Sequence, residues 1–170
     1  MSTVTKKQIR NDPFFTSDGC GNKSVAVYTL EVNASGVAVN SDLATALQIG
    51  DVVRIGVLPA GFKMIDALFI TSDAFTALVT ANIGFEYVDG VDSSAVPQDA
   101  DYFGTAITLH TQGRYPADNA AVKPETLPKD AYVTLTMAGA ACAAAGRVDV
   151  VIYGVHTGAN MDGGGSSTMV

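Results

Sequence analysis

The chain has 170 residues, which fits one compact domain that buries roughly 70% of the surface its unfolded chain exposes, so it needs no disulfide or metal to fold. Only 16% of the residues are charged and 48% are hydrophobic, so apolar surface should remain once a core is filled, and self-association is the simplest way to cover it. The formal net charge of −7 speaks against recognition of nucleic acid through phosphates, which requires a basic stripe.

Residues 1–23 are polar and are predicted to form an extended N-terminal arm. Asp12-Pro13 and the Gly-rich stretch at 18–21 disfavour both helix and strand. The segment holds four basic and two acidic residues, a charge of +2 that leaves −9 for the rest of the chain. A basic arm is attracted to the acidic body of a neighbouring copy in an oligomer, and salt weakens that attraction. The residues predicted to contact a partner are Lys6, Lys7, Arg10, Phe14 and Phe15.

The N-terminus has no apolar stretch long enough for a signal peptide, and no later segment has about 18 uninterrupted apolar residues. We therefore expect the protein to be made in a cytoplasm and not secreted. A membrane is not expected among its partners.

The clearest alternation of apolar and polar residues predicts a half-buried strand at residues 77–87. The apolar face of this strand consists of Ala77, Val79, Ala81, Ile83, Phe85 and Tyr87. Alternation or a high content of β-branched residues predicts further strands at 25–32, 52–58, 63–71, 105–109, 131–137 and 148–155. The second faces of 25–32, 52–58 and 148–155 are less polar than a surface facing water requires.

One short helix is predicted at residues 41–48, where Ser41 or Asp42 is the candidate N-cap and Gly50 is the stop. Two long connections are predicted at 89–103 and 111–130, and connections of that length are usually functional or mobile.

Seven or eight short strands separated by turns predict an all-β fold, an antiparallel β-sandwich or jelly roll with an extended N-terminal arm and little helix. The predicted organisation is an arm at 1–23, a sandwich domain at 24–157 and a flexible tail at 158–170. The tail contains a Gly-Gly-Gly-Ser-Ser run and no apolar period.

The sequence contains few candidates for catalytic or metal-binding residues. The only two histidines, His110 and His156, each end a predicted strand without a nucleophile motif, and they lack the His-x-His spacing of jelly-roll metal enzymes. Such an enzyme is a minor alternative that requires the two histidines to converge on a metal. Cys20 and Cys142 follow no metal or redox spacing and are interpreted as a loop thiol and a small buried residue. We expect no enzyme activity, cofactor or metal.

The acidic connection at 89–103 supports two further hypotheses. Its four carboxylates are oxygen ligands of the kind Ca²⁺ prefers, although the spacing is not that of an EF-hand and Asp is also common in turns. These residues are Asp89, Asp92, Asp99 and Asp101. A receptor- or glycan-binding module would instead expose aromatic side chains near the loops. The candidates for that surface are Tyr87, Tyr102, Phe103 and Tyr115.

The middle of the chain reads Gln-Ile-Gly-Asp-Val-Val-Arg-Ile-Gly-Val-Leu-Pro-Ala-Gly at 48–61, followed by Ile-Asp-Ala-Leu-Phe-Ile at 65–70. In these motifs the chain resembles small virion structural proteins of tailed bacteriophages. An acidic Asp-Ala-Asp-Tyr-Phe segment at 99–103 and a closing hairpin between residues 132 and 153 extend the resemblance to about residues 48–157. These motifs mark turns and strands, so no catalytic residues carry over.

The resemblance implies a non-catalytic head decoration or cement protein on the capsid surface, commonly a homotrimer, with the major capsid protein as its partner. A different virion role, such as a capsid, tail or fibre-associated component, places the same demands on the sequence. A receptor- or glycan-binding module is the alternative from another class.

Overall fold

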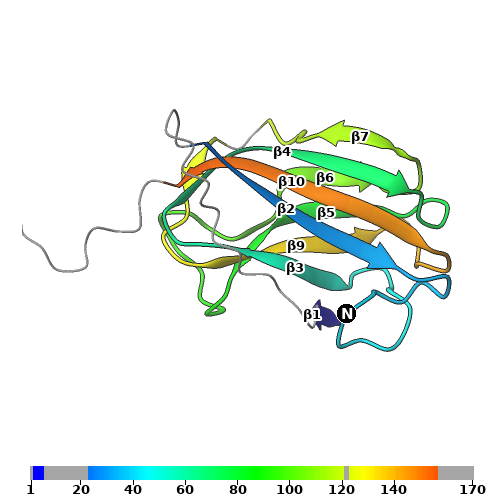
Figure 1. Ribbon diagram of the computed structural model, residues 1–170. Helices are drawn as coiled ribbons and strands as arrows, with labels where there is room; N and C mark the ends of the chain where they lie inside the picture. Colours follow the sequence, from blue (N-terminus) through cyan, green and yellow to red (C-terminus); the bar gives the residue numbers. More distant parts are fainter. Residues whose placement is uncertain (1, 6–22, 121–122, 157–170) are drawn as a thin grey trace, which may run out of the picture.

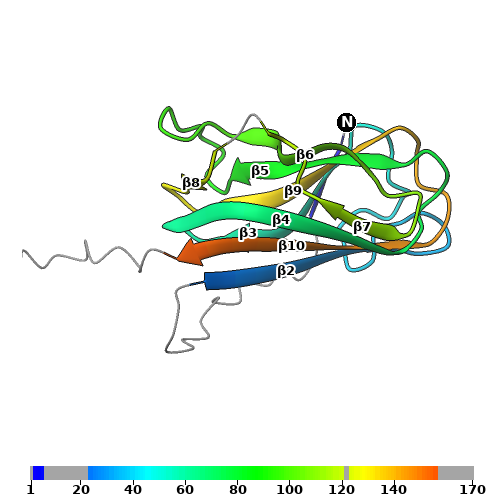
Figure 2. The same ribbon diagram turned by 90° about the horizontal axis from the view of Figure 1, so that it is seen from above.

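Two β-sheets packed face to face make up the protein, as Figures 1 and 2 show from two sides. The structure is a computed structural model, and it describes residues 2–5, 23–120 and 123–156. These described ranges contain ten strands, β1 (Thr3–Thr5), β2 (Lys23–Val32), β3 (Val52–Leu58), β4 (Phe62–Asp73), β5 (Thr80–Tyr87), β6 (Asp99–Thr108), β7 (Gly113–Pro116), β8 (Glu125–Thr126), β9 (Ala131–Ala138) and β10 (Gly146–His156).

The first sheet has the order β1-β3-β9-β5-β6, and the second has the order β2-β10-β4-β7 with β8 paired to β4. All the pairings are antiparallel except that between β1 and β3. The described ranges contain no helix, and hence no helix able to cross a membrane. The predictions of an all-β fold and an antiparallel sandwich are confirmed.

The core lies between the sheets and is lined by the alternating apolar residues that the sequence pattern identified. On β5 the side chains of Ile83, Phe85 and Tyr87 are almost completely buried. On β9 the side chains of Val133 and Leu135 are equally inaccessible, and the register places Phe85 opposite Val133. Two strands with the clearest period therefore lie side by side at the centre of one sheet.

Pairing between the strands is nested with respect to the chain. Among the eight strands other than β1 and β8, the first pairs with the last, β2 with β10, and the second with the seventh, β3 with β9. The third pairs with the sixth, β4 with β7, and the fourth with the fifth, β5 with β6. The strands of the first two pairs are far apart in sequence, so the sandwich is assembled mainly from long-range contacts.

The predicted helix at residues 41–48 is wrong, because backbone groups of this segment are bonded to other parts of the chain. The Asp42 N–H donates to the Thr5 carbonyl O at 2.9 Å, and the Leu47 N–H donates to the Gly36 carbonyl O at 3.0 Å. The side chain of Leu47 is fully buried. Burial of Leu47 and these tertiary hydrogen bonds outweigh the propensity of an eight-residue helix, which is too short to be stable by itself.

The two predicted long connections contain strands that the pattern did not reveal. Residues 99–103 belong to β6, in which Tyr102, Phe103 and Gly104 are consecutively buried and Ala106 has a positive φ of 52°. This irregularity removes the alternation by which a strand is recognised. The second connection contains β7 and β8, which have only four and two residues and no apolar period.

The predicted closing hairpin between residues 132 and 153 is also wrong. Strand β9 pairs with β3 and β5, whereas β10 pairs with β2 and β4 in the opposite sheet. The connection between them begins at Gly139, which has φ of +75°. At Gly139 an added Cβ would lie 2.0 Å from the Leu78 carbonyl O. The chain can therefore cross between the sheets at this position because glycine has no side chain.

Part of the predicted N-terminal arm is described. Residues 3–5 form β1 beside β3, with Val4 fully buried in the core. The Asp51 and Asp42 carboxylates accept hydrogen bonds at 2.8 Å from the N–H groups of Ser2 and Thr5. Residues 6–22 and 157–170 lie outside the described residues, so the extended arm and the flexible tail stay predictions.

Replacing a central core isoleucine tests the sandwich. Ile83→Ala removes a fully buried side chain from β5 and should lower the free energy of unfolding by about 2–5 kcal/mol. The matched control, Ile49→Ala, removes an exposed isoleucine and should change it by less than about 0.5 kcal/mol. Urea denaturation measures both, and equal losses would contradict the assignment of the core.

Two glycines with positive φ test the crossing between the sheets. Gly90→Ala, with φ of +69° and open space around the added Cβ, should cost only the left-handed backbone strain of about 1–2 kcal/mol. Gly139→Ala adds the clash with the Leu78 carbonyl and should cost about 1–3 kcal/mol more. Thermal unfolding of the two variants compares them, and a Gly139→Ala loss no larger than that of Gly90→Ala would refute the close approach.

Candidate functional site

The residues predicted to contact a partner lie outside the described part of the chain. They are Lys6, Lys7, Arg10, Phe14 and Phe15. Their anchoring points are described: Thr5 ends β1 next to β3, and Lys23 begins β2. The prediction that these residues bind a partner is therefore not tested by the geometry.

The two histidines are far apart. His110 lies near the start of β10. Its Nδ1 is 3.1 Å from the Val79 carbonyl O, and the carbonyl O of the preceding residue, Leu109, accepts a hydrogen bond from the Phe75 N–H. Phe75 in turn packs against Gly146, the first residue of β10. His156 is the last residue of β10. At about 3.3 Å per residue, the ten steps along this strand separate them by roughly 33 Å. No group of three metal-ligating side chains occurs within the described ranges, and the backbone does not bring the histidines to one metal.

Cys142 is a small buried residue, as interpreted from the sequence. Only 2% of its surface is exposed, and burial raises the pKa of its thiol to about 11. The thiolate is the reactive form of cysteine, so Cys142 should be inert near neutral pH. Cys20 lies outside the described residues.

The four aspartates of the acidic connection accept hydrogen bonds from neighbouring groups. Asp89 pairs with the Lys129 ammonium at 2.9 Å, and Asp92 accepts the Gln98 N–H at 2.7 Å. In β6, Asp99 and Asp101 accept hydrogen bonds from a backbone N–H and from the Thr105 hydroxyl. These are contacts typical of turns and strand ends, and they lend no support to the calcium hypothesis.

The aromatic residues predicted to form an exposed platform are mostly buried, which corrects that prediction. Tyr87, Tyr102 and Phe103 each expose less than a tenth of their surface, and Tyr115 is half-buried against the core. Phe85 packs edge-on against Tyr87 at 5.8 Å and Tyr102 at 5.3 Å between ring centroids. The rings therefore stabilise one end of the core, since edge-to-face pairs are favourable beyond their burial.

An irregularity in β4 creates an exposed apolar surface that sequence reasoning did not locate. Tyr153 of β10 lies opposite Asp66 and the next residue, Gly154, lies opposite Met64, which leaves Ile65 as an extra residue in a β-bulge. Met64 is fully buried, while Ile65 and Asp66 both point outward. The bulge thus places an exposed isoleucine beside the tyrosine ring of the neighbouring strand.

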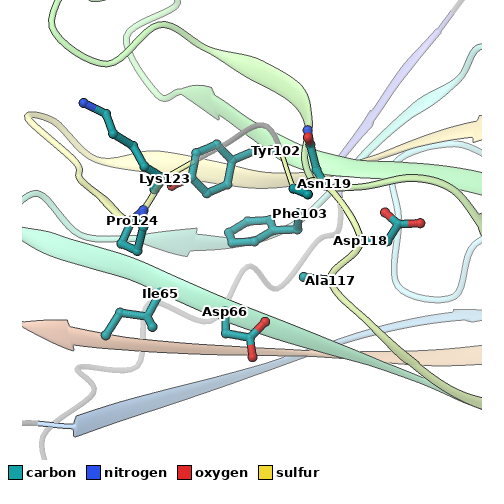
Figure 3. A pocket seen from close by; sticks show the side chains of 10 residues that line it. Ile65, Asp66, Tyr102, Phe103, Ala117, Asp118, Asn119, Lys123 and Pro124 are labelled. Atoms are coloured by element: carbon teal, nitrogen blue, oxygen red, sulfur yellow. Dashed lines mark hydrogen bonds between the residues drawn. The ribbon is translucent and has the colours of Figure 1, made fainter.

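Three hollows follow one another across this bulge, and we call them the bulge groove. The first, of 330 Å³, lies among Val25, Ile65 and Tyr153 on the outer face of the second sheet. The second, of 190 Å³, shares Ile65 and Asp66 with the first and extends to Tyr102, Phe103 and Pro124, as Figure 3 shows. The third, of 280 Å³, shares Tyr102 and Lys123 with the second and reaches Val96, Pro97 and Asp99.

The bulge groove is acidic. Among its described lining residues, four carboxylates oppose one cation, Lys123, which pairs with Glu125 at 3.0 Å. The four are Asp66, Asp99, Asp118 and Glu125. Burial raises the pKa of the Asp99 carboxyl, and its hydrogen bond with Asp101 lowers the pKa of the Asp101 carboxyl. The groove has apolar walls and a negative rim, so it suits a ligand that is both apolar and basic.

The wall of the second hollow is held by the Tyr102 hydroxyl. It donates to the Lys123 carbonyl O at 2.7 Å and accepts the Glu125 N–H at 3.2 Å, which ties the segment before β8 to β6. Burial raises the pKa of Tyr102, so the hydroxyl stays neutral and able to donate at neutral pH.

Comparison with known proteins finds structural likeness without sequence likeness. No known family model matches the sequence, and no curated protein matches it either. A chain from the capsid of Ralstonia phage GP4 shares the fold with a TM-score of 0.64 and 16% identity, over 93% of this chain and 100% of that one. A chain of the cyanophage Pam1 capsid asymmetric unit has a TM-score of 0.51 and 16% identity, over 87% of this chain and 96% of that one. At these identities the likeness establishes a common fold.

Removing one hydroxyl tests how the groove wall is held. Tyr102→Phe leaves the Lys123 carbonyl and the Glu125 N–H without this partner and should lower the free energy of unfolding by about 1 kcal/mol. Tyr115→Phe is the matched control, because its hydroxyl makes one exposed bond to the Thr111 carbonyl and its loss should cost less than about 0.5 kcal/mol. As a local measurement, we expect proteases to cleave within residues 119–126 faster in Tyr102→Phe than in Tyr115→Phe. Equal cleavage of the two variants would contradict the role of the Tyr102 hydroxyl in holding this segment.

Proposed function

We propose that the chain is a non-catalytic structural protein of a bacteriophage virion, and specifically a decoration or cement protein that stabilises the assembled head. The observation that carries this proposal is the match in fold with the phage GP4 capsid chain, which spans 93% of this chain and the whole of that one. The low identity limits the support to the architecture.

The topology also supports the proposal. Nested pairing, with sheets β2-β10-β4-β7 and β3-β9-β5-β6, is the strand order of an eight-stranded jelly roll, a fold that viral capsid domains use. Rolling up one long antiparallel double strand produces this order. We therefore assign the sandwich to the jelly-roll architecture.

The surface is suited to assembly. Val25 and Val27 on β2, Ile65 on β4 and Tyr153 on β10 expose large apolar side chains on the outer face of the second sheet. Neighbouring apolar side chains of this kind mark protein contacts more often than they mark an isolated surface. We propose that the chain forms a homotrimer, binds the major capsid protein on the capsid surface, and is made in the host cytoplasm before joining the virion.

Because many symmetric copies act together, weak contacts between each copy and the shell are sufficient to stabilise the head. A subunit that touches two neighbouring shell proteins stabilises the junction against internal pressure, and simultaneous engagement raises the effective affinity without any new contact. No single residue is then expected to dominate binding.

Solution mass and sedimentation with phage heads test this function. Light scattering of the purified chain should give three times the 17.5 kDa chain mass, and the protein should cosediment with undecorated heads. Heads that already carry their decoration protein are the control and should bind much less. A monomer that fails to sediment with undecorated heads would contradict the proposal and favour a binding module.

A further inference from the structure

Within the described ranges, the bulge groove is lined by exposed apolar side chains. Val25, Ile65 and Tyr153, which line its first hollow, expose 51%, 48% and 38% of their surface. Three large apolar side chains this close together are costly to leave in water, at roughly 25 cal/mol for each Å² of apolar surface. A segment that covers these side chains would therefore gain free energy from their burial.

The chain itself contains a segment whose chemistry matches the groove. Residues 6–22 carry three basic side chains, Lys6, Lys7 and Arg10, and a pair of aromatic ones, Phe14 and Phe15. Basic groups complement the four carboxylates of the groove, and an aromatic ring suits the 330 Å³ hollow. This match in charge and in apolar character is the reason for choosing residues 6–22 as the occupant.

The length of the segment places its aromatic pair where it can reach a neighbour. Thr5 is fixed in β1 and Lys23 begins β2, so Phe14 and Phe15 lie midway along the 17 residues that join these strands. Eight residues extend at most about 27 Å, a length that reaches a groove on a neighbouring copy as well as the groove of the same chain.

We propose that residues 6–22 of one copy dock in the bulge groove of a second copy. Phe14 and Phe15 enter the hollow formed by Val25, Ile65 and Tyr153, and the three basic side chains face Asp66, Asp99 and Glu125. Each copy gives a segment and receives one, a heterologous contact that closes into a ring when three copies meet. The inference rests on the proposed function in one respect, the closed trimer, and it specifies the contact that holds the trimer together.

Cysteine cross-linking between two differently tagged chains tests the contact. One chain carries Phe15→Cys and the other Ile65→Cys, both with Cys20→Ser, and Cys142 stays silent because it is buried. After coexpression and mild oxidation we expect a covalent heterodimer. Its yield should exceed that of the control pair Phe15→Cys and Ile49→Cys by about tenfold or more, since docking holds the thiols at millimolar effective concentration. Ile49 is at least as exposed as Ile65, but it lies just before β3, which belongs to the other sheet.

Two results would overturn the proposal. One is a heterodimer yield equal to that of the Ile49 control. The other comes from a chain that carries both Phe15→Cys and Ile65→Cys. A disulfide that forms only within single chains would show that the segment covers its own groove.

Solution mass provides a second readout that does not depend on thiols. Ile65→Asp should convert the trimer to monomers, whereas Ile49→Asp should leave the mass unchanged, and a trimer that survives Ile65→Asp would refute the contact. The proposed function is tested separately by binding to heads. Wild-type chain that cosediments with heads but gives no heterodimer would defeat the inference alone, whereas a heterodimer without binding to heads would defeat the cement function.

Discussion

Contact between the inner faces of the two sheets is the interaction on which the other features of the molecule depend. Strands β5 and β9 contribute fully buried side chains from one sheet, and β4 and β10 contribute Phe69, Val150 and Ile152 from the other. Burial of this apolar surface fixes the register of each strand, because a slip by one residue would turn every side chain to the opposite face. The register in turn determines which residues remain outside.

The outer surface is shaped by one of the places where the strand register is broken. At the bulge in β4 two consecutive residues, Ile65 and Asp66, face solvent, while Met64 and Ala67 on either side stay in the core. The core therefore continues on both sides of the bulge, and the consequence of the bulge is that the apolar side chain of Ile65 is exposed. Natural proteins retain bulges where a side chain has to be re-aimed, and here the re-aimed side chain separates two hollows.

Sequence reasoning located the central strands because their burial is one-sided. The predicted range 52–58 coincides with β3, and 131–137 differs from β9 by one residue. It failed where alternation is interrupted, as in β6 with its positive φ at Ala106, and where tertiary hydrogen bonds override local propensity, as at Asp42. The only signal for the groove was the unusually apolar second face of 25–32 and 148–155. No local pattern could show that Ile65 is an extra residue, because a bulge is defined by the partner strand.

Nested pairing also governs when the chain can fold. Lys23 pairs with Val155, so β2 has no strand beside it in the second sheet until β10 has left the ribosome. Folds dominated by such distant contacts form slowly, since loop closure precedes the energetic gain. Throughout synthesis the valine-rich β2 presents an unpaired edge, which is a template for aggregation. Chaperones that shield this first long strand until the last one arrives would therefore reduce aggregation during synthesis.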